Sequence, residues 1–322
     1  MQTRDLVAAL ADGRDWSGNE LAQRFGVTRA AVWKRLAELR RAGLPLAAMA
    51  GHGYRLALPL ELLDAQAIRA GLPPLLRARF ADLAVHWDID STNSELMRSA
   101  AAHADFAVCL AEQQHAGRGR RGRQWQSPLL CNIYLSLLKR FDCGMGSLSG
   151  LSLAVGVAVA RALEHCGAPA LGLKWPNDVL AGDAKLAGIL VELGGEFLGP
   201  CYAVIGVGVN LYLPAAVREA IDQPVADLAA CCTPLPSRNV LAAALLAEFA
   251  RVLDQFASDG FAALREDFAQ RDRLLGRALV LSDAAGSHSG VGAGIDARGA
   301  LLLRQGDTIV RFDSAEVTVR KA

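Results

Sequence analysis

The residues best suited to chemistry lie in a thirteen-residue stretch, 113–125, with the sequence QQHAGRGRRGRQW. Three glycines and four arginines fill its centre, so neither a regular helix nor a packed strand is favoured. Glycine lets backbone N–H groups approach a ligand, and arginine offers paired planar donors to phosphate or carboxylate oxygens. The stretch predicts a mobile cationic loop whose target is an anion. The alternative is a solvated Arg-Gly segment that contacts RNA or nothing at all.

Further polar side chains stand at the ends of apolar runs that we expect to be strands. They are Ser91, Thr92 and Asn93 after the run 83–90, the loop itself after 106–112, Asn177 and Asp178 after Pro176, Lys185 at the start of 185–192, and Asn210 near the end of 202–211. Local explanations exist for several of them: Thr92 with Glu95 has capping-box spacing, Asn177-Asp178 fits an Asx turn, and a lysine at a strand start is usually solvated. No Ser-His-Asp order, carboxylate pair or Walker lysine motif is present. Cations and amides converging in this way predict a site that positions anionic groups and supplies no protein nucleophile.

The composition of the chain indicates what kind of protein must position these residues. The chain has 322 residues, 52% hydrophobic and 21% charged, which is enough for two or three globular domains. A net charge of +1 provides no global attraction to nucleic acid or membrane, so any such contact must be local. The uncharged run 143–160 begins with Gly and Ser residues and predicts a loop entering a buried helix, not a membrane span.

Cysteine usage and the N-terminus indicate the compartment. Seven cysteines include no C-x-x-C pair and predict reduced, mostly buried thiols, while the six histidines lack metal-ligand spacing with them and predict no structural zinc. The N-terminus has no apolar signal region, which indicates the cytoplasm.

Residues 1–58 predict a separate winged helix-turn-helix domain. Two short apolar-faced helices precede a third at 29–41, with Ser17 and Glu20 spaced as a capping box and Thr28 as the cap of the third helix. In that third helix we expect Ala30, Val32, Leu36 and Leu39 to face inward. The segment 44–56 predicts a β-hairpin, and nine Lys and Arg outnumber five Asp and Glu in residues 1–58, which suits phosphate contact. We predict DNA-contacting residues Thr28, Arg29, Trp33 and Lys34. The alternative is a helical domain that serves oligomerisation or docking.

The rest of the chain predicts three segments. Residues 59–80, with Pro73-Pro74, are expected to be a linker, and residues 81–270 have α/β or α+β patterning with a strand at 131–138 and a buried helix at 148–166. Residues 271–322 alternate in short runs around the turn 296–299 and predict a small β-barrel.

Four motifs in register identify a family resemblance: Ser91-Thr92-Asn93, the loop 117–122 with Trp125, Lys174-Trp-Pro-Asn-Asp178, and Lys185-Leu-Ala-Gly-Ile-Leu. Together they resemble biotin-protein ligases, that is, biotin-[acetyl-CoA-carboxylase] ligases, and with the N-terminal domain the bifunctional form that is also the biotin operon repressor. The resemblance implies an α+β fold with a winged helix-turn-helix, a mixed-sheet catalytic domain like that of class II synthetases, and an SH3-like domain. It also implies that biotin and ATP react, with Mg²⁺, to give biotinyl-adenylate, and that the acyl group passes to a lysine of a biotin carboxyl carrier domain. Operator DNA and a ligand-promoted homodimer are the further partners that it implies.

The resemblance also implies roles, position by position. The biotin head group would be held by Ser91, Thr92, Asn93 and Gln114, and biotin and the adenylate would be covered by Arg118, Gly119 and Arg120. Lys185 would contact the biotin carboxyl and the α-phosphate, and with Arg118 and Arg120 it completes the predicted catalytic set. The nucleotide side would be formed by Arg121, Trp125, Asn177, Asn210 and Arg320.

Two other functions are compatible with parts of this pattern. One is a DNA-binding sensor that binds biotin without transferring it, although a retained Lys185 and a complete loop favour catalysis. The other is lipoate or octanoate transfer, whose enzymes share the catalytic fold but lack this Gly-Arg loop. The chain departs from the family at His115, where another glutamine is frequent, which affects the rim of the site.

Overall fold

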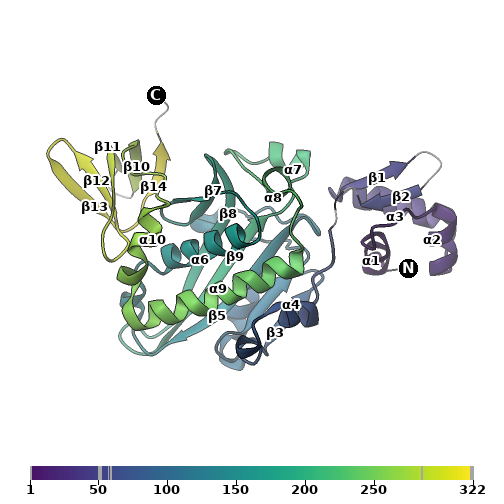
Figure 1. Cartoon of the computed structure of the whole chain (residues 1–322), viewed down its shortest axis with the longest axis horizontal. Helices are drawn as coiled ribbons and strands as arrows, with labels where there is room; N and C mark the ends of the chain where they lie inside the picture. Colours follow the sequence, from purple (N-terminus) through teal and green to yellow (C-terminus); the bar gives the residue numbers. More distant parts are fainter. Residues whose placement is uncertain (1, 50–52, 57, 59, 284–285, 320–322) are drawn as a thin grey trace.

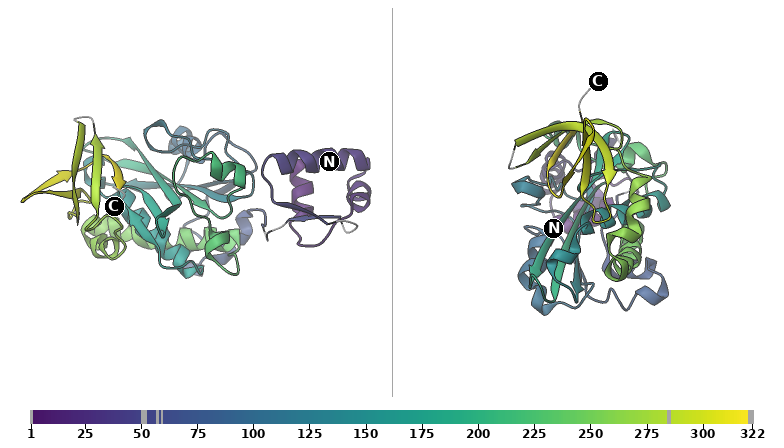
Figure 2. Two further views of the ribbon diagram at one scale, coloured as in Figure 1. Left: turned by 90° about the horizontal axis from the view of Figure 1, so that it is seen from above. Right: turned by 90° about the vertical axis from the view of Figure 1, so that its left-hand side faces the viewer.

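The computed structural model describes residues 2–49, 53–56, 58, 60–283 and 286–319. Three helices and a hairpin form its N-terminal unit. The elements are α1 (Thr3–Leu10), α2 (Gly18–Phe25), α3 (Arg29–Arg41), β1 (Leu46–Met49) and β2 (Gly53–Leu56). The two strands pair antiparallel, and Figure 2 shows the unit at one end of the molecule. The predicted winged helix-turn-helix arrangement is confirmed.

Side-chain caps set the helix boundaries in this unit. Ser17 Oγ accepts from the N–H of Glu20, and the N–H of Ser17 donates to the Glu20 carboxylate, so the predicted capping box is present. Thr28 Oγ1 accepts from the N–H of Ala31 and begins α3, as predicted. Our expectation for Ala30 was wrong: it is exposed, because the first turn of α3 presents this position to solvent while later positions such as Val32 turn inward.

The segment 59–80, which we expected to be a linker, carries structure of its own. It contains α4 (Ala65–Gly71), capped by Asp64, and the short 3₁₀ helix η1 (Pro74–Leu76). Ile68 and Phe80 are completely buried in the central core. We therefore place the start of the central domain near residue 60, because burial of these apolar side chains fixes the segment to that domain.

A seven-stranded mixed sheet forms the centre of the molecule, in the order β3-β4-β5-β9-β8-β7-β6. Only the β3–β4 pair is parallel among these neighbours. The strands are β3 (Leu83–His86), β4 (Val108–Ala111), β5 (Asn132–Phe141), β6 (Gly172–Lys174), β7 (Asp178–Ala181), β8 (Ala184–Gly195) and β9 (Cys201–Asn210).

Helices cover the two faces of this sheet unequally. The buried helix predicted at 148–166 is present as α6 (Leu151–His165), and it packs with the 22-residue α9 (Arg238–Asp259) over one face (Figure 1). On the opposite face α5 (Thr92–Ser99) covers only the ends of β4, β5 and β9, through a small cluster that includes Leu96 and Val204. The remainder of that face is available for a ligand site. The other helices are α7 (Ala215–Glu219), α8 (Leu228–Cys231) and α10 (Arg265–Ala269).

In the described residues no helix is long and apolar enough to span a membrane.

The C-terminal unit is a five-stranded antiparallel sheet in the order β13-β12-β11-β10-β14, which bears out the predicted strands. Its strands are β10 (Ala278–Asp283), β11 (Gly286–Ile295), β12 (Leu301–Gln305), β13 (Thr308–Phe312) and β14 (Glu316–Val319). Over the described residues β13 and β14 do not pair and form the two edges of this sheet. The indole N–H of buried Trp175 donates to the carbonyl of Gly299 at 2.9 Å, which ties this sheet to the central domain.

Candidate active site

One cavity of about 1060 Å³ gathers the predicted ligand-binding residues on the α5 face of the central sheet. Every one that lies in the described residues lines it: Ser91, Thr92, Asn93, Gln114, Arg118, Gly119, Arg120, Arg121, Trp125, Asn177, Lys185 and Asn210. They come from strand ends and loops that are far apart in the sequence. Arg320 lies outside the described residues.

The start of α5 forms one end of the cavity. Ser91 is the N-cap, with its hydroxyl accepting from the N–H of Ser94, so the local alternative, a capping box formed by Thr92 and Glu95, is not what begins this helix. The helix begins one residue earlier than that box requires, so the Thr92 hydroxyl does not cap it and lies at the cavity. Thr92 donates to Gln114 Oε1 from its backbone N–H at 2.9 Å and from its hydroxyl at 3.1 Å.

Gln114 joins the N-terminal end of the cationic loop to its C-terminal end. Its amide nitrogen donates to Ser127 Oγ at 3.0 Å, while its amide oxygen accepts from the backbone N–H of Thr92. The loop is also closed by backbone bonds, since the N–H of Trp125 donates to the carbonyl of Gly117 at 2.9 Å. Donors and acceptors of both kinds are thus held at fixed positions at this end of the cavity.

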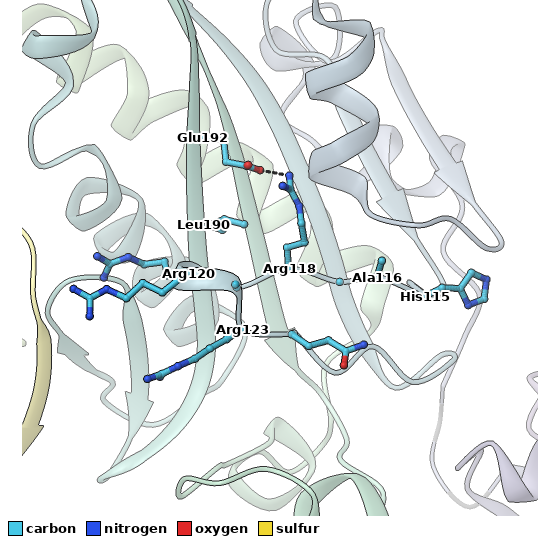
Figure 3. A pocket seen from close by; sticks show the side chains of 12 residues that line it. His115, Ala116, Arg118, Arg120, Arg123, Leu190 and Glu192 are labelled. Carbon is cyan, nitrogen blue, oxygen red and sulfur yellow. Dashed lines mark hydrogen bonds and ion pairs between the residues drawn. The ribbon is translucent and has the colours of Figure 1, made fainter. Parts of the chain in front are cut away.

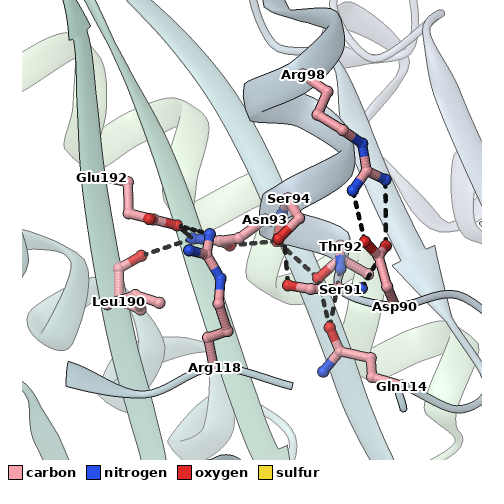
Figure 4. A network of polar contacts seen from close by, with 11 residues as sticks. Asp90, Ser91, Thr92, Asn93, Ser94, Arg98, Gln114, Arg118, Leu190 and Glu192 are labelled. Atoms are coloured by element: carbon pink, nitrogen blue, oxygen red, sulfur yellow. Dashed lines mark hydrogen bonds and ion pairs between the residues drawn. The ribbon is translucent and has the colours of Figure 1, made fainter. Parts of the chain in front are cut away.

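A second polar group at this end is centred on the buried side chain of Asn93. Its Oδ1 lies 2.5 Å from Ser136 Oγ, and its amide nitrogen donates to Glu192 Oε2 at 2.9 Å. The same Glu192 oxygen accepts from Arg118 Nη2 at 2.5 Å (Figure 4). An amide of α5, a carboxylate of β8 and a guanidinium of the loop therefore meet at one atom.

Glycines form the floor of the cavity because larger residues would fill it. A Cβ on Gly206 would lie 2.1 Å from Asn93 Oδ1, and one on Gly208 would lie 2.3 Å from the Trp125 indole. The indole therefore rests directly on the sheet backbone. Its N–H is buried and has no hydrogen-bond partner among the described residues.

A β-bulge directs Lys185 into the cavity. Val179 pairs with Ala187 but Leu180 pairs with Lys185, so β8 carries one extra residue at this point, and the side-chain alternation reverses. Lys185 then shares a face with Gly188: its Nζ would lie 3.3 Å from a Cβ built there. The Lys185 side chain is 15% exposed, and its Nζ lies 2.7 Å from Asp178 Oδ1 and 5.5 Å from the Trp125 ring centre.

The loop arginines reach to both sides of the cavity. Arg118 points to Glu192, while Arg120 lies 3.4 Å from Asn177 Oδ1 and 3.5 Å from Ser314 Oγ of the C-terminal unit. Figure 3 shows these side chains around a smaller cavity of about 600 Å³, which is lined by the loop and by Leu190 and Glu192 of β8.

The strand-end amides also hold the backbone of the site. Asn177 donates from its side chain to the carbonyl of Ile189 at 2.8 Å, and Asn210 donates to the carbonyls of Ala226 at 3.1 Å and Lys185 at 3.4 Å. Both residues therefore fix the strands that carry the cavity lining, in addition to any contact with a ligand.

The N-terminal unit presents its predicted DNA-contacting residues along α3. Arg29, Trp33 and Lys34 are exposed, and the Trp33 side chain is 65% accessible, which is unusual for an indole without a partner surface. Thr28 uses its hydroxyl to cap the helix.

Burial sets the protonation state of two thiols outside the cavity. Seven cysteines are free, and burial raises the pKa of the Cys109 and Cys131 thiols to about 12, which keeps them protonated. Within the described ranges no group of three or more His, Cys, Asp or Glu side chains could hold a metal ion.

Two acidic residues of the site were absent from our predicted set. Asp178 belongs to a motif that we had noted, and its position next to Asn177 at a strand end was the available signal. Glu192 ends an apolar strand segment, and only the fold shows that it faces α5 and the loop.

The fold and cavity define a ligand-binding catalytic domain joined to a helix-turn-helix unit, and comparison with known proteins agrees with this class. Residues 87–210 match the biotin/lipoate A/B protein ligase family, and residues 2–55 match an HTH domain family. The bifunctional ligase/repressor BirA of Salmonella typhimurium is 37% identical over 98% of this chain and 97% of its own length. The chain therefore belongs to the biotin/lipoate A/B protein ligase family.

Shorter relatives and solved structures agree. The biotin–[acetyl-CoA-carboxylase] ligase of Paracoccus denitrificans is 36% identical over 67% of this chain and 91% of its own length. The structure of the Aquifex aeolicus biotin protein ligase in complex with biotin and ATP covers 76% of this chain and all of that chain, at a TM-score of 0.65 and 24% identity. This structural likeness supports the fold over the part of the chain that it covers.

Proposed function

We propose that this chain is a biotin-protein ligase that forms biotinyl-adenylate and transfers biotin to a lysine of a biotin carboxyl carrier domain. The family supports the reaction class. The observation that carries the proposal is the single cavity in which Lys185, the loop arginines and the α5 amides converge.

The first step brings two anions together. A biotin carboxylate oxygen attacks the α-phosphorus of ATP, a bond forms between them, and the bond to the β-phosphate oxygen breaks to release pyrophosphate. Lys185 would contact the carboxylate and the α-phosphate with two of its N–H donors, while Asp178 holds the ammonium in position. Arg118 and Arg120 add positive charge above them, so their fixed placement lowers the repulsion before the bond forms.

The remaining roles follow the positions of the lining residues. Biotin's ureido ring offers two N–H donors and a carbonyl acceptor, which suits the mixed groups of Ser91, Thr92, Asn93 and Gln114 at the α5 end. The adenine would pack on Trp125, and the nucleotide side would be formed by Arg121, Asn177 and Asn210, with Arg320 as a further predicted contact.

Mg²⁺ fits this site as an ion that arrives with ATP. The cavity lining offers the carboxylates of Asp178, Asp183 and Asp222, and one or two carboxylates with substrate phosphates are the usual protein environment of Mg²⁺. When bound, Mg²⁺ would neutralise phosphate charge.

The second step and the regulatory role concern partners. The amine of an acceptor lysine attacks the biotinyl carbonyl, an amide forms, and AMP leaves. The N-terminal unit would bind operator DNA through α3 and repress biotin synthesis genes, with adenylate promoting a homodimer. A non-catalytic biotin sensor is the alternative function.

Biotin-dependent exchange of pyrophosphate into ATP tests the first step without an acceptor. We expect exchange with biotin and Mg-ATP and none without biotin. Lipoate as a competitor distinguishes the family branches, because a biotin ligase keeps its exchange rate when lipoate is added. Absence of exchange, with biotin binding intact, would favour the sensor.

A further inference from the structure

We propose that Glu192 is a positioning residue that holds the cationic loop against the biotin end of the cavity. The proposal rests on the proposed function, since it concerns retention of biotin and its adenylate. Glu192 itself is assigned no contact with the reacting atoms.

The Glu192 carboxylate joins two side chains that differ in mobility. A single oxygen, Glu192 Oε2, receives the Asn93 amide at 2.9 Å and the Arg118 guanidinium at 2.5 Å. Asn93 is 4% exposed and has its other polar atom on Ser136, so it has little freedom to turn. Arg118 is 42% exposed on an irregular loop and has much more to lose in conformational freedom. The carboxylate therefore ties a mobile cation to a rigid amide.

Glu192 lies on the cavity face of β8, far along the strand from Lys185. Gly188, Leu190 and Glu192 alternate along β8 on the cavity face, opposite Gly208, Gly206 and Val204 of β9. The pair with Arg118 consequently spans from the sheet to the loop at the end of the cavity where α5 begins (Figures 3 and 4). The reacting end, at Lys185, lies at the start of the same strand.

These positions assign separate tasks to the two ends of β8. Lys185 acts on the reacting groups, while Glu192 keeps the loop closed over the biotin moiety and orients Asn93 toward it. Losing the negative charge should therefore open the loop more often and release ligand faster, while chemistry in the closed complex is preserved.

Glu192→Gln separates charge from shape, because glutamine still offers Asn93 a carbonyl acceptor but gives Arg118 only a neutral one. We expect the KM for biotin in pyrophosphate exchange to rise about fivefold to tenfold and adenylate release to accelerate by a similar factor, with kcat within about twofold. The matched control is Glu196→Gln, which removes the same charge from an exposed position four residues on. Glu192→Asp, which keeps the charge, should recover part of the loss.

A double variant with Arg118→Gln tests whether Glu192 acts through Arg118. If the carboxylate acts through Arg118, adding Glu192→Gln to Arg118→Gln should change adenylate release little further. Wild-type KM and release rate in Glu192→Gln would overturn the proposal, as would equal changes in Glu196→Gln. If Glu192→Gln does not fold, Glu192→Asp serves as the test. A wild-type adenylate release rate and a wild-type KM for biotin in this variant, whose side chain is shorter, would also overturn the proposal.

The wild-type protein decides the proposed function independently. If it shows no biotin-dependent exchange, the ligase proposal fails. The positioning proposal then depends on biotin affinity measured by calorimetry, and equal affinity of wild type and Glu192→Gln would reject it.

Discussion

The ammonium of Lys185 and the carboxylate of Asp178 form an ion pair of 2.7 Å across the β7–β8 bulge, and both side chains are mostly buried. The bulge directs the lysine into the cavity, and the aspartate fixes its position there. This pair is the core of the proposed adenylating site.

Lys185→Ala should nearly abolish biotin-dependent pyrophosphate exchange and leave the fold intact, because no other described cation stands at this point of the cavity floor. Asp178→Asn should reduce kcat by about tenfold to a hundredfold, since an uncharged partner holds the lysine less firmly. Asp307→Asn is the matched control, as Asp307 is exposed between β12 and β13 and does not line the cavity. Near wild-type turnover of Lys185→Ala would contradict the assigned role.

Arg120→Gly should speed loss of biotinyl-adenylate from the site, because Arg120 lies between the loop, Asn177 and the C-terminal Ser314. Arg120→Lys keeps the charge, so its rate of adenylate loss should lie between those of wild type and Arg120→Gly. The measurement is a chase of labelled adenylate with unlabelled adenylate. Identical release rates for Arg120→Gly and wild type would show that this arginine does not retain the adenylate.

Glu112→Gln should lower the free energy of unfolding of the central domain by about 3 kcal/mol, because it leaves the guanidinium of Arg238 buried beside a neutral partner. The Glu112 and Arg238 side chains are 3% and 0% exposed and lie 2.6 Å apart. They also hold the segment that follows the N-terminal unit: Glu112 accepts from the N–H of Leu63, and Arg238 donates to the carbonyl of Glu61. Urea unfolding measures the loss.

The comparison for that prediction is an exposed pair. Asp254→Asn removes the partner of Arg79 at the surface and should cost about 0–1 kcal/mol. Equal losses for the two variants would contradict the special importance of the buried pair.

Lys34→Ala should weaken DNA binding and lower the slope of log affinity against log salt by about one, as expected for loss of one phosphate contact. Fluorescence anisotropy with a duplex at several salt concentrations provides the slope. Arg35→Ala is the control, because Arg35 is partly buried and pairs with Glu38 within α3. Equal slopes for Lys34→Ala and wild type would show that Lys34 does not contact a DNA phosphate.

Cys109 and Cys131 should resist thiol reagents in the folded protein at pH 8 and react once it is unfolded. Their pKa is raised to about 12 by burial, so the folded state keeps both thiols neutral. Their contribution to stability is complete below the unfolded pKa of about 8.5 and is lost as the pH rises toward 12. Fast labelling of either thiol in the folded protein, located by peptide mass mapping, would contradict this burial.

The sequence predicted most of the elements that carry the site, because local patterns determine them. Capping residues marked α2 and α3, and apolar runs marked the strands that precede Ser91 and Asn177 and the strand that carries Lys185. Tertiary relations were not predictable in this way. The bulge that turns Lys185 and the contact of Glu192 with Arg118 depend on strand register and loop path. The long helix α9 was missed, although it covers one face of the sheet.

Transfer of biotin to an acceptor tests the central claim most directly. The protein is incubated with biotin, Mg-ATP and a biotin carboxyl carrier domain, and the acceptor is examined by intact mass. We predict a gain of one biotin on the acceptor with wild type and none with Lys185→Ala. No gain with wild type, when acceptor and nucleotide are shown to be competent with a known ligase, would contradict the ligase assignment and leave the DNA-binding sensor as the better account.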